Sequence, residues 1–411
     1  MKLEKEDLLR LVDEHSPELI RLCQDLIRIP SENPGGSQRE VMDYVKAYLD
    51  AANIKSTEVG ELKEFPSIYA EMGEKEGYTL IFNGHLDVVP AGDLSKWRFD
   101  PFGGEVVEGK ILGRGASDMK CGVAAVLFVA KLLAREQIKL KGQIRLHLVS
   151  DEETGGVGTS WLCENGYADG ADACIVAEPT SKTIEIGQKG KLKLTIHAKG
   201  QPAHGSLGGF KGENAIMKLI PALDRLANLT KLQGSSAKSQ LHALDSSKQV
   251  ANKELGAGAG EVIDHVAVNV GVIKGGTAVN MVPENCEAIV DIRVPLGLDR
   301  QTVDAAIKEC LEKEDVTYKL EWHSDANATD EYDPLVQSVK TNAESLWPFE
   351  VIPAYQWASS DAREYRELGL TTLQYGPSNT EGIHSYNEDV DVLDVVNTAK
   401  IYLLTIFDLL L

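Results

Sequence analysis

The chain has 411 residues, of which 43% are hydrophobic and 26% charged, a composition ordinary for a globular protein whose length indicates two or three domains. Its net charge of −21 disfavours nucleic-acid binding, because a strongly acidic field repels phosphates. The N-terminal segment is charged and amphipathic, and no apolar run approaches the roughly 18 residues of a membrane span, so we expect a cytoplasmic protein.

The first part of the chain alternates helical and strand patterns. Strands tend to follow helices here, which favours an α/β domain with a largely parallel sheet flanked by helices. The predicted elements are helices at 5–28, 38–53 and 122–137, and strands at 67–73, 78–84, 142–153 and 172–180.

The middle of the chain has a different pattern. Its order of elements is β-α-β-β-α-β, which is the ferredoxin-like split pattern and indicates an inserted α+β domain. The predicted elements are strands at 191–200, 265–276, 286–295 and 317–325, and helices at 213–230 and 300–314. Residues 232–262 are rich in Ser, Gly, Ala and Lys and are predicted to form a loop or insertion.

From 334 to 411 the chain returns to helix, strand and helix. We therefore predict a discontinuous outer domain at 1–190 and 327–411, with an inserted domain at 191–326.

The six cysteines are widely separated and include no Cys-x-x-Cys pair, which argues against zinc fingers and redox motifs. We expect buried free thiols, as in a reducing compartment. They are Cys23, Cys121, Cys163, Cys174, Cys286 and Cys310.

Residues able to bind a metal follow the predicted strands of the outer domain. Ligands of open α/β sheets bind at the carboxyl ends of the strands, and imidazole with carboxylate suits zinc. Alone, a histidine at a strand end is more often structural and an acidic pair more often solvated, but the set favours a site. The residues are His85 and Asp87, Asp118 in a Gly-rich stretch, Asp151 with Glu152 and Glu153, Glu178, and His384.

Eight stretches in the two predicted domains resemble the M20 family of metallopeptidases and amidohydrolases. The family includes acetylornithine deacetylase, succinyl-diaminopimelate desuccinylase and glutamate carboxypeptidase. They occur in the family's order over most of the chain. The stretches are "GHLDVVP", "GRGASDMKCGVAA", "SDEETGG", "AEPT", "AHGS", "GGTAVNMVPENCEAIVDIR", "SSDAR" and "GIHSYNE".

The resemblance implies a site for two Zn²⁺ ions, to which Co²⁺ and Mn²⁺ are suitable alternatives. His85 and Glu178 would bind one metal, Glu153 and His384 the other, and Asp118 both. It also implies that Asp87 holds the other ring nitrogen of His85, that Glu152 is the general base, and that the Asp118–Met119 peptide is cis.

For the inserted domain, the resemblance implies a lid that also forms a homodimer. His204 would reach the neighbouring subunit's site and stabilise the oxyanion. Asn280, Arg293 and Arg363 resemble residues that contact the substrate. For Arg293 the alternative is a surface arginine paired with Asp291.

Two features depart from the family pattern. Ser378 stands where many relatives have glycine, and the 232–262 segment is longer than a simple lid needs. Both bear on the substrate more than on the chemistry.

The sequence therefore predicts a two-zinc hydrolase that cleaves the amide bond of an N-acyl amino acid or a short peptide with a free carboxylate. The choice between a deacylase or desuccinylase and a dipeptidase or carboxypeptidase stays open. A non-catalytic metal-binding relative is a further alternative, against which the complete ligand set and base argue. A serine hydrolase has little support, because no G-x-S-x-G motif occurs.

Overall fold

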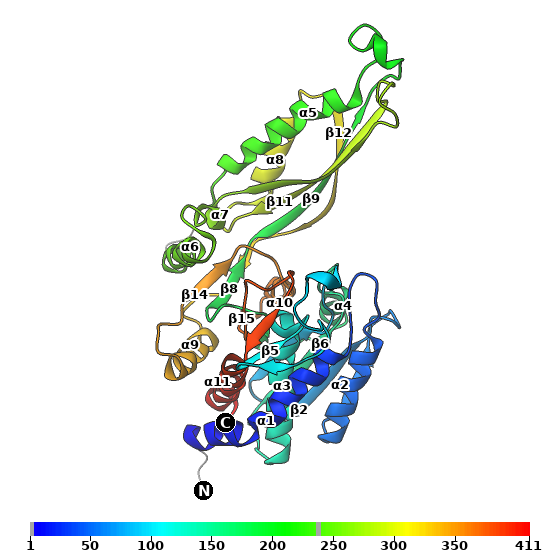
Figure 1. The fold of residues 1–411 in the computed structure, drawn as a ribbon. Coiled ribbons are helices and arrows are strands. Elements are labelled where there is room, and N and C mark those ends of the chain that lie inside the picture. The colour runs from blue at the N-terminus through cyan, green and yellow to red at the C-terminus, as the bar shows by residue number, and fades with distance from the viewer. Residues whose placement is uncertain (1–3, 236–239) are drawn as a thin grey trace. The chain divides into compact units, whose positions relative to one another are not determined.

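A computed structural model describes residues 4–235 and 240–411 of the chain (Figure 1). The chain forms two compact units. Unit 1 comprises the residues up to Ile186 together with Thr329–Pro353 and Ser360–Leu411, and unit 2 comprises Gly187–Ala328 and Ala354–Ser359.

Unit 1 contains most of the predicted α/β elements, several with the predicted bounds to within one or two residues. Its helices are α1 (Lys5–Arg28), α2 (Arg39–Ala51), α3 (Cys121–Arg135), α4 (Val157–Glu164), α9 (Pro334–Leu346), α10 (Ala362–Glu367) and α11 (Val392–Leu410). Its strands are β1 (Ser56–Val59), β2 (Ser67–Gly73), β3 (Thr79–His85), β4 (Val106–Val107), β5 (Lys110–Leu112), β6 (Gln143–Val149), β7 (Ala173–Val176), β15 (Thr371–Gln374) and β16 (Asp389–Asp391). The chain passes between the units within β8 (Ile184–Gln188) and β14 (Pro353–Gln356).

The central sheet of unit 1 has the strand order β1-β2-β6-β3-β7-β15-β8. Strands β6, β3, β7 and β15 run parallel, whereas β1, β2 and β8 pair antiparallel. Every residue of β3 is buried, as expected of a strand covered on both faces. The predicted mixed, largely parallel sheet is confirmed. A separate small sheet, β16-β5-β4, was not predicted.

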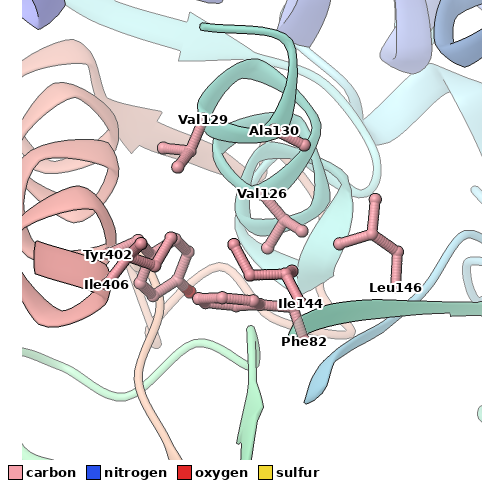
Figure 2. Close-up of a pocket in the computed structure, with 8 residues that line it drawn as sticks. All are labelled: Phe82, Val126, Val129, Ala130, Ile144, Leu146, Tyr402 and Ile406. Atoms are coloured by element: carbon pink, nitrogen blue, oxygen red, sulfur yellow. The ribbon is translucent and has the colours of Figure 1, made fainter. Parts of the chain in front are cut away.

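Helices cover both faces of this sheet, as neighbouring residues of β3 show. Ile81 packs with Ala362 and Tyr365 of α10, whereas Phe82 lies against α3 and α11, because successive strand residues point to opposite faces. Figure 2 shows the second face: Phe82 and Ile144 lie below Val126 of α3 and beside Tyr402 of α11. The small apolar pocket lined by these buried side chains belongs to the core of unit 1.

Unit 2 has the predicted β-α-β-β-α-β order, with two further helices, α6 and α7, between the first helix and the second strand. Its elements are β9 (Gly190–Lys199), α5 (Ala215–Leu226), α6 (Leu241–Leu255), α7 (Glu261–Asp264), β10 (Ala267–Gly275), β11 (Asn285–Val294), α8 (Arg300–Leu311), β12 (Val316–Ser324) and the short β13 (Asn327–Ala328). The antiparallel sheet has the order β10-β11-β9-β12. Apolar residues of α5 and α8 pack on one sheet face around Leu194, Ile196 and Val290 (Figure 1).

The prediction of a loop at 232–262 is wrong for much of its length, because Leu241–Leu255 forms helix α6. The buried face of α6 includes Ala243, Ser247 and Ala251, four residues apart. Small Ala and Ser side chains give a weak hydrophobic period, so the sequence resembled a loop. Residues 236–239 of the predicted loop lie outside the described residues.

Two smaller expectations are met. All six cysteines are free and all but Cys310 are buried. The Asp118–Met119 peptide is cis, and so is Asn33–Pro34. Within the described residues, none of the helices combines the length and the apolar character that crossing a membrane requires.

Candidate metal centre

The predicted ligands of unit 1 meet at the carboxyl edge of its parallel strands. His85 is the last residue of β3, Glu153 lies four residues after β6, and Glu178 lies two residues after β7. These three strands are parallel neighbours, so their carboxyl ends lie at the same edge. Asp118 stands in the turn before α3, and His384 in the loop between β15 and β16.

Five side chains form two groups that share Asp118. The first group is His85, Asp118 and Glu178, and the second is Asp118, Glu153 and His384, with ligand atoms within 4.8 Å of one another in each. Asp118 Oδ1 lies 3.2 Å from His85 Nε2, and its Oδ2 lies 3.4 Å from His384 Nε2. The two carboxylate oxygens of Asp118 therefore face different imidazoles, as a shared ligand requires.

The outer members of each group lie at similar range. His85 Nε2 is 3.8 Å from Glu178 Oε1, and His384 Nε2 is 3.0 Å from Glu153 Oε2. His85 is almost fully buried, whereas 53% of the His384 side chain is exposed. The second group therefore reaches the surface through His384, while Glu153 and the shared Asp118 are largely covered.

Asp87 contacts both sides of the cluster. The Nδ1 atom of His85 lies 2.9 Å from the Asp87 backbone oxygen and 3.5 Å from its carboxylate, so the backbone makes the closer contact. The Asp87 carboxylate accepts hydrogen bonds from the backbone N–H groups of Glu152 and Glu153, both at 3.2 Å, and from Asn33 Nδ2 at 2.9 Å. Asp87 thus orients His85 and also fixes the turn that carries both glutamates.

The charges of the cluster favour cation binding. Burial raises the pKa values of Glu152, Glu153 and Glu178, and nearby carboxylates add to the effect. Burial also acts to raise the pKa of Asp118, but hydrogen bonds with His384 and His85 outweigh it and lower that pKa. The hydrogen bonds with Asp118 and Glu153 raise the pKa of His384 to about 10.

The donor set therefore fits two divalent metal ions. Histidines bind metals as neutral imidazoles, and in that form Asp118, Glu153 and Glu178 have no counter-charge of their own in the cluster. Two divalent cations supply that charge, and imidazole nitrogen with carboxylate oxygen suits zinc, cobalt and manganese.

Residues 81–408 match the model of peptidase family M20/M25/M40. The chain belongs to this family. It is therefore a hydrolase that acts on carbon–nitrogen bonds, and its family includes dinuclear metal-binding peptidases.

Sequence relatives of the chain cover nearly its whole length. It is 28% identical over 380 residues to a probable succinyl-diaminopimelate desuccinylase of Staphylococcus epidermidis, covering 90% of this chain and 92% of that one. It is also 28% identical over 406 residues to a succinyl-diaminopimelate desuccinylase of Hydrogenovibrio crunogenus, covering 96% and 99% of the two chains.

The fold of the chain is shared with solved structures. An M20 family metallo-carboxypeptidase from Sulfolobus solfataricus superimposes with a TM-score of 0.79 at 20% identity, covering 95% of this chain and 98% of that one.

Two residues that the sequence prediction missed hold the loops of the centre. The buried carboxylate of Glu388 accepts hydrogen bonds from the backbone N–H groups of Gly115, Ser117 and Asp118, and pairs with Arg114. Both residues lie inside stretches that carry the family resemblance, "GRGASDMK" and "GIHSYNE". An isolated Arg or Glu there gives no signal, because the pair is 274 residues apart in the chain.

A buried carboxylate, Asp361, was also missed, although it stands in the quoted stretch "SSDAR". It accepts a 2.6 Å hydrogen bond from Thr159 Oγ1, and burial raises the pKa of Asp361 to about 6. Arg363 lies on α10, with Glu364 and Glu367 of the same helix among its ionic partners. Neither ligand group contains Arg363.

The other predicted site residues lie in unit 2. His204 is exposed, its Nδ1 lies 2.8 Å from Ser206 Oγ, and the adjacent Gly205 N–H donates to the Asn280 backbone oxygen at 2.7 Å. His204 and Asn280 therefore lie on neighbouring segments. Arg293 Nε donates to both carboxylate oxygens of Asp291, at 3.1 and 3.0 Å, which is the pairing that the alternative for Arg293 predicts.

Proposed function

We propose that this member of the M20 family hydrolyses the amide bond of an N-acyl amino acid or a short peptide with a free carboxylate, with the help of two metal ions. The observation that carries the proposal is the pair of ligand groups sharing Asp118, with Glu152 next to a residue of the second group. His85 and Glu178 would hold one ion, Glu153 and His384 the other, and Asp118 both.

We take zinc as the resident metal, since a set of imidazole nitrogen and carboxylate oxygen donors suits it. When bound, two such ions supply Lewis-acid activation of the scissile carbonyl and of the attacking water. Measurement of metal content after growth in defined medium, by inductively coupled plasma mass spectrometry, separates zinc from cobalt and manganese.

Glu152 is the proposed general base. It belongs to neither ligand group, and its backbone is fixed by the hydrogen bond to Asp87, so its carboxylate stays available to take a proton. Burial raises the pKa of Glu152 well above that of a free glutamate, and this favours delivery of the proton to the leaving amine nitrogen. Water thus loses its proton to Glu152 as it attacks, and the amine receives that proton as the C–N bond breaks.

The test of this role is Glu152→Gln, with the exposed Glu105→Gln as control. We expect Glu152→Gln to lower kcat by about 10²–10⁴-fold, the usual contribution of a general base, while metal content stays at two ions per chain. Retention of activity would contradict the role of Glu152, and loss of the metal would show that it acts as a ligand instead.

Residues of unit 2 and α10 are proposed to recognise the substrate. In this proposal His204 stabilises the oxyanion that develops in a neighbouring subunit's site. Asn280 and Arg293 contact the substrate carboxylate or the reaction intermediate, and Arg363 is a further anchor for the substrate. This scheme needs a homodimer formed through unit 2, which sedimentation velocity tests. Mixing a His204→Ala chain with a Glu152→Gln chain should then restore part of the activity, because mixed dimers contain one complete site.

The sequence relatives, which are named desuccinylases, favour an N-acyl amino acid as the substrate and thus a desuccinylase or deacylase activity. The peptidase alternative stays open. The metallo-carboxypeptidase from Sulfolobus solfataricus does not decide the question, because at 20% identity it shows a shared fold alone. A panel of N-succinyl amino acids, N-acetyl amino acids and dipeptides, compared by kcat/KM with metal-loaded protein, decides between them. We propose a cytoplasmic location, which the buried free thiols support and cell fractionation tests.

A further inference from the structure

The buried ion pair of Arg114 and Glu388 connects the two loops that carry Asp118 and His384. Both carboxylate oxygens of Glu388 are used. Its Oε1 accepts from the N–H groups of Ser117 at 2.9 Å and Asp118 at 3.0 Å, and its Oε2 accepts from Arg114 Nη1 at 2.6 Å and Gly115 N–H at 3.1 Å. One side chain therefore fixes the backbone from residue 115 to residue 118.

Arg114 extends this connection to the second loop. Its Nη2 donates to the backbone oxygen of Ser385 at 2.8 Å, and Ser385 follows His384 directly. Its guanidinium also stacks over the Trp97 ring at 5.2 Å. The side chains of Arg114 and Glu388 are 3% and 1% exposed, so water does not compete for these contacts.

The two ligand groups depend on this pair to different extents. His85 ends a fully buried strand and Asp87 holds its ring, so the central sheet fixes its position. His384 lies in a loop and has a φ angle of +55°. Arg114 and Glu388 hold the chain that follows His384. The position of His384 relative to Asp118 therefore depends on the Arg114–Glu388 pair, whereas the position of His85 does not.

We propose that Arg114 and Glu388 are positioning residues that set the metal affinity of the second group, Asp118, Glu153 and His384. The inference rests on the proposed function, in that each group binds a metal ion. Residues that orient metal ligands typically alter affinity by about 10–100-fold when replaced. The first group should change much less, because only Asp118 is common to both.

The test is titration of the metal-free full chain with Zn²⁺ alone, followed by isothermal titration calorimetry, for wild type, Glu388→Gln and Arg114→Lys. We expect two binding events in wild type and a loss of about 10–100-fold in the affinity of one event in each variant. His384→Ala identifies that event, because it removes the same one. Excess Zn²⁺ should restore kcat in both variants, which a general loss of structure would not allow.

Lys110→Met is the matched control. Lys110 pairs at 2.9 Å with Asp389, the residue after Glu388, but 43% of its side chain is exposed. Both affinities should match wild type in this variant. Arg114→Lys keeps the buried charge, so it tests the inference even if Glu388→Gln fails to fold by circular dichroism.

The outcomes separate two failures. If folded Glu388→Gln or Arg114→Lys binds both ions as wild type does, the positioning role is overturned. An equal loss of affinity at both sites overturns the assignment of that role to the second group. If wild type itself binds fewer than two Zn²⁺ ions, the two-metal site of the proposed function fails instead.

Discussion

His85 and His384 occupy equivalent places in the two ligand groups, yet the protein holds them in opposite ways. His85 is the final residue of a strand whose every residue is buried, and its ring is held from two residues away. His384 stands in a loop, with half of its side chain exposed. A strand places a ligand by burial and ladder pairing, whereas a loop must be fixed by contacts from elsewhere in the chain. We call these the strand-held and loop-held sides.

Asp118→Ala should have the largest effect, because Asp118 belongs to both sides. We expect loss of both metal ions and a decrease in kcat/KM on the order of 10³-fold or more, since Lewis-acid activation contributes several kcal/mol to transition-state stabilisation. Metal analysis and steady-state kinetics measure both. A folded variant that keeps two ions would remove Asp118 from the shared position.

His85→Ala and His384→Ala compare the two sides directly. Each should cost one metal ion. In metal-free protein, His85→Ala should lower the free energy of unfolding by about 2–4 kcal/mol, because it leaves a cavity and unpaired buried carboxylates. His384→Ala should cost less, about 1–2 kcal/mol, because Glu153 and Asp118 lose a partner but the half-exposed side chain leaves no cavity. Urea denaturation measures the difference, and equal losses would contradict the contrast between the sides.

Asp87→Asn tests the brace on the strand-held side. Asparagine keeps the size of the side chain but cannot accept every hydrogen bond that the carboxylate takes from the two glutamate N–H groups and Asn33. We expect a loss of about 10–100-fold in metal affinity, the usual range for residues behind a ligand. Zn²⁺ titration measures it, and affinities equal to wild type would assign Asp87 to folding alone.

Asp394→Asn examines the start of the loop-held side, where the Ser378 N–H donates to Asp394 at 3.2 Å. Burial raises the pKa of Asp394 from 3.8 to about 6. A carboxyl whose folded pKa is raised stabilises the protein below its unfolded pKa, and this stabilisation is lost as the pH rises through the folded pKa.

Relative to Asp394→Asn, wild type should therefore lose on the order of 1–3 kcal/mol of stability between about pH 4 and pH 7. Urea denaturation of the metal-free proteins across that range measures the difference. Parallel pH profiles of the two proteins would show that Asp394 does not titrate as its burial implies.

Ser378→Gly should have the smallest effect. Ser378 Oγ accepts a 2.6 Å hydrogen bond from the Ser181 N–H, which joins the segment after Glu178 to the loop of His384. Its loss should cost about 0.5–1.5 kcal/mol, the usual net value of one hydrogen bond. Thermal denaturation measures this, and an unchanged midpoint would mean that the bond does not couple the two sides.

Much of unit 1 could be predicted because its signals are local. The apolar run that forms α3 and the buried strand β3 can each be predicted from a few consecutive residues. Helix α6 could not be predicted, because its buried face consists largely of Ala and Ser while Leu241 and Leu255 are exposed, so the apolar residues do not mark its buried side. The roles of Arg114 and Glu388 were equally hidden, since each looks like an ordinary charged residue until the fold pairs them.

By itself the sequence determined the order of the elements, the mixed parallel sheet, and which side chains are suited to bind a metal, since periodicity and residue chemistry are written along the chain. The tertiary structure added the distances by which Asp118, which the family resemblance had already implied as the shared ligand, faces both imidazoles, and it alone decided which side chains hold the two loops. Those contacts join Asp118 to His384 and Arg114 to Glu388. The partners are more than 260 positions apart in the chain, and a local sequence pattern cannot predict contacts between residues so far apart.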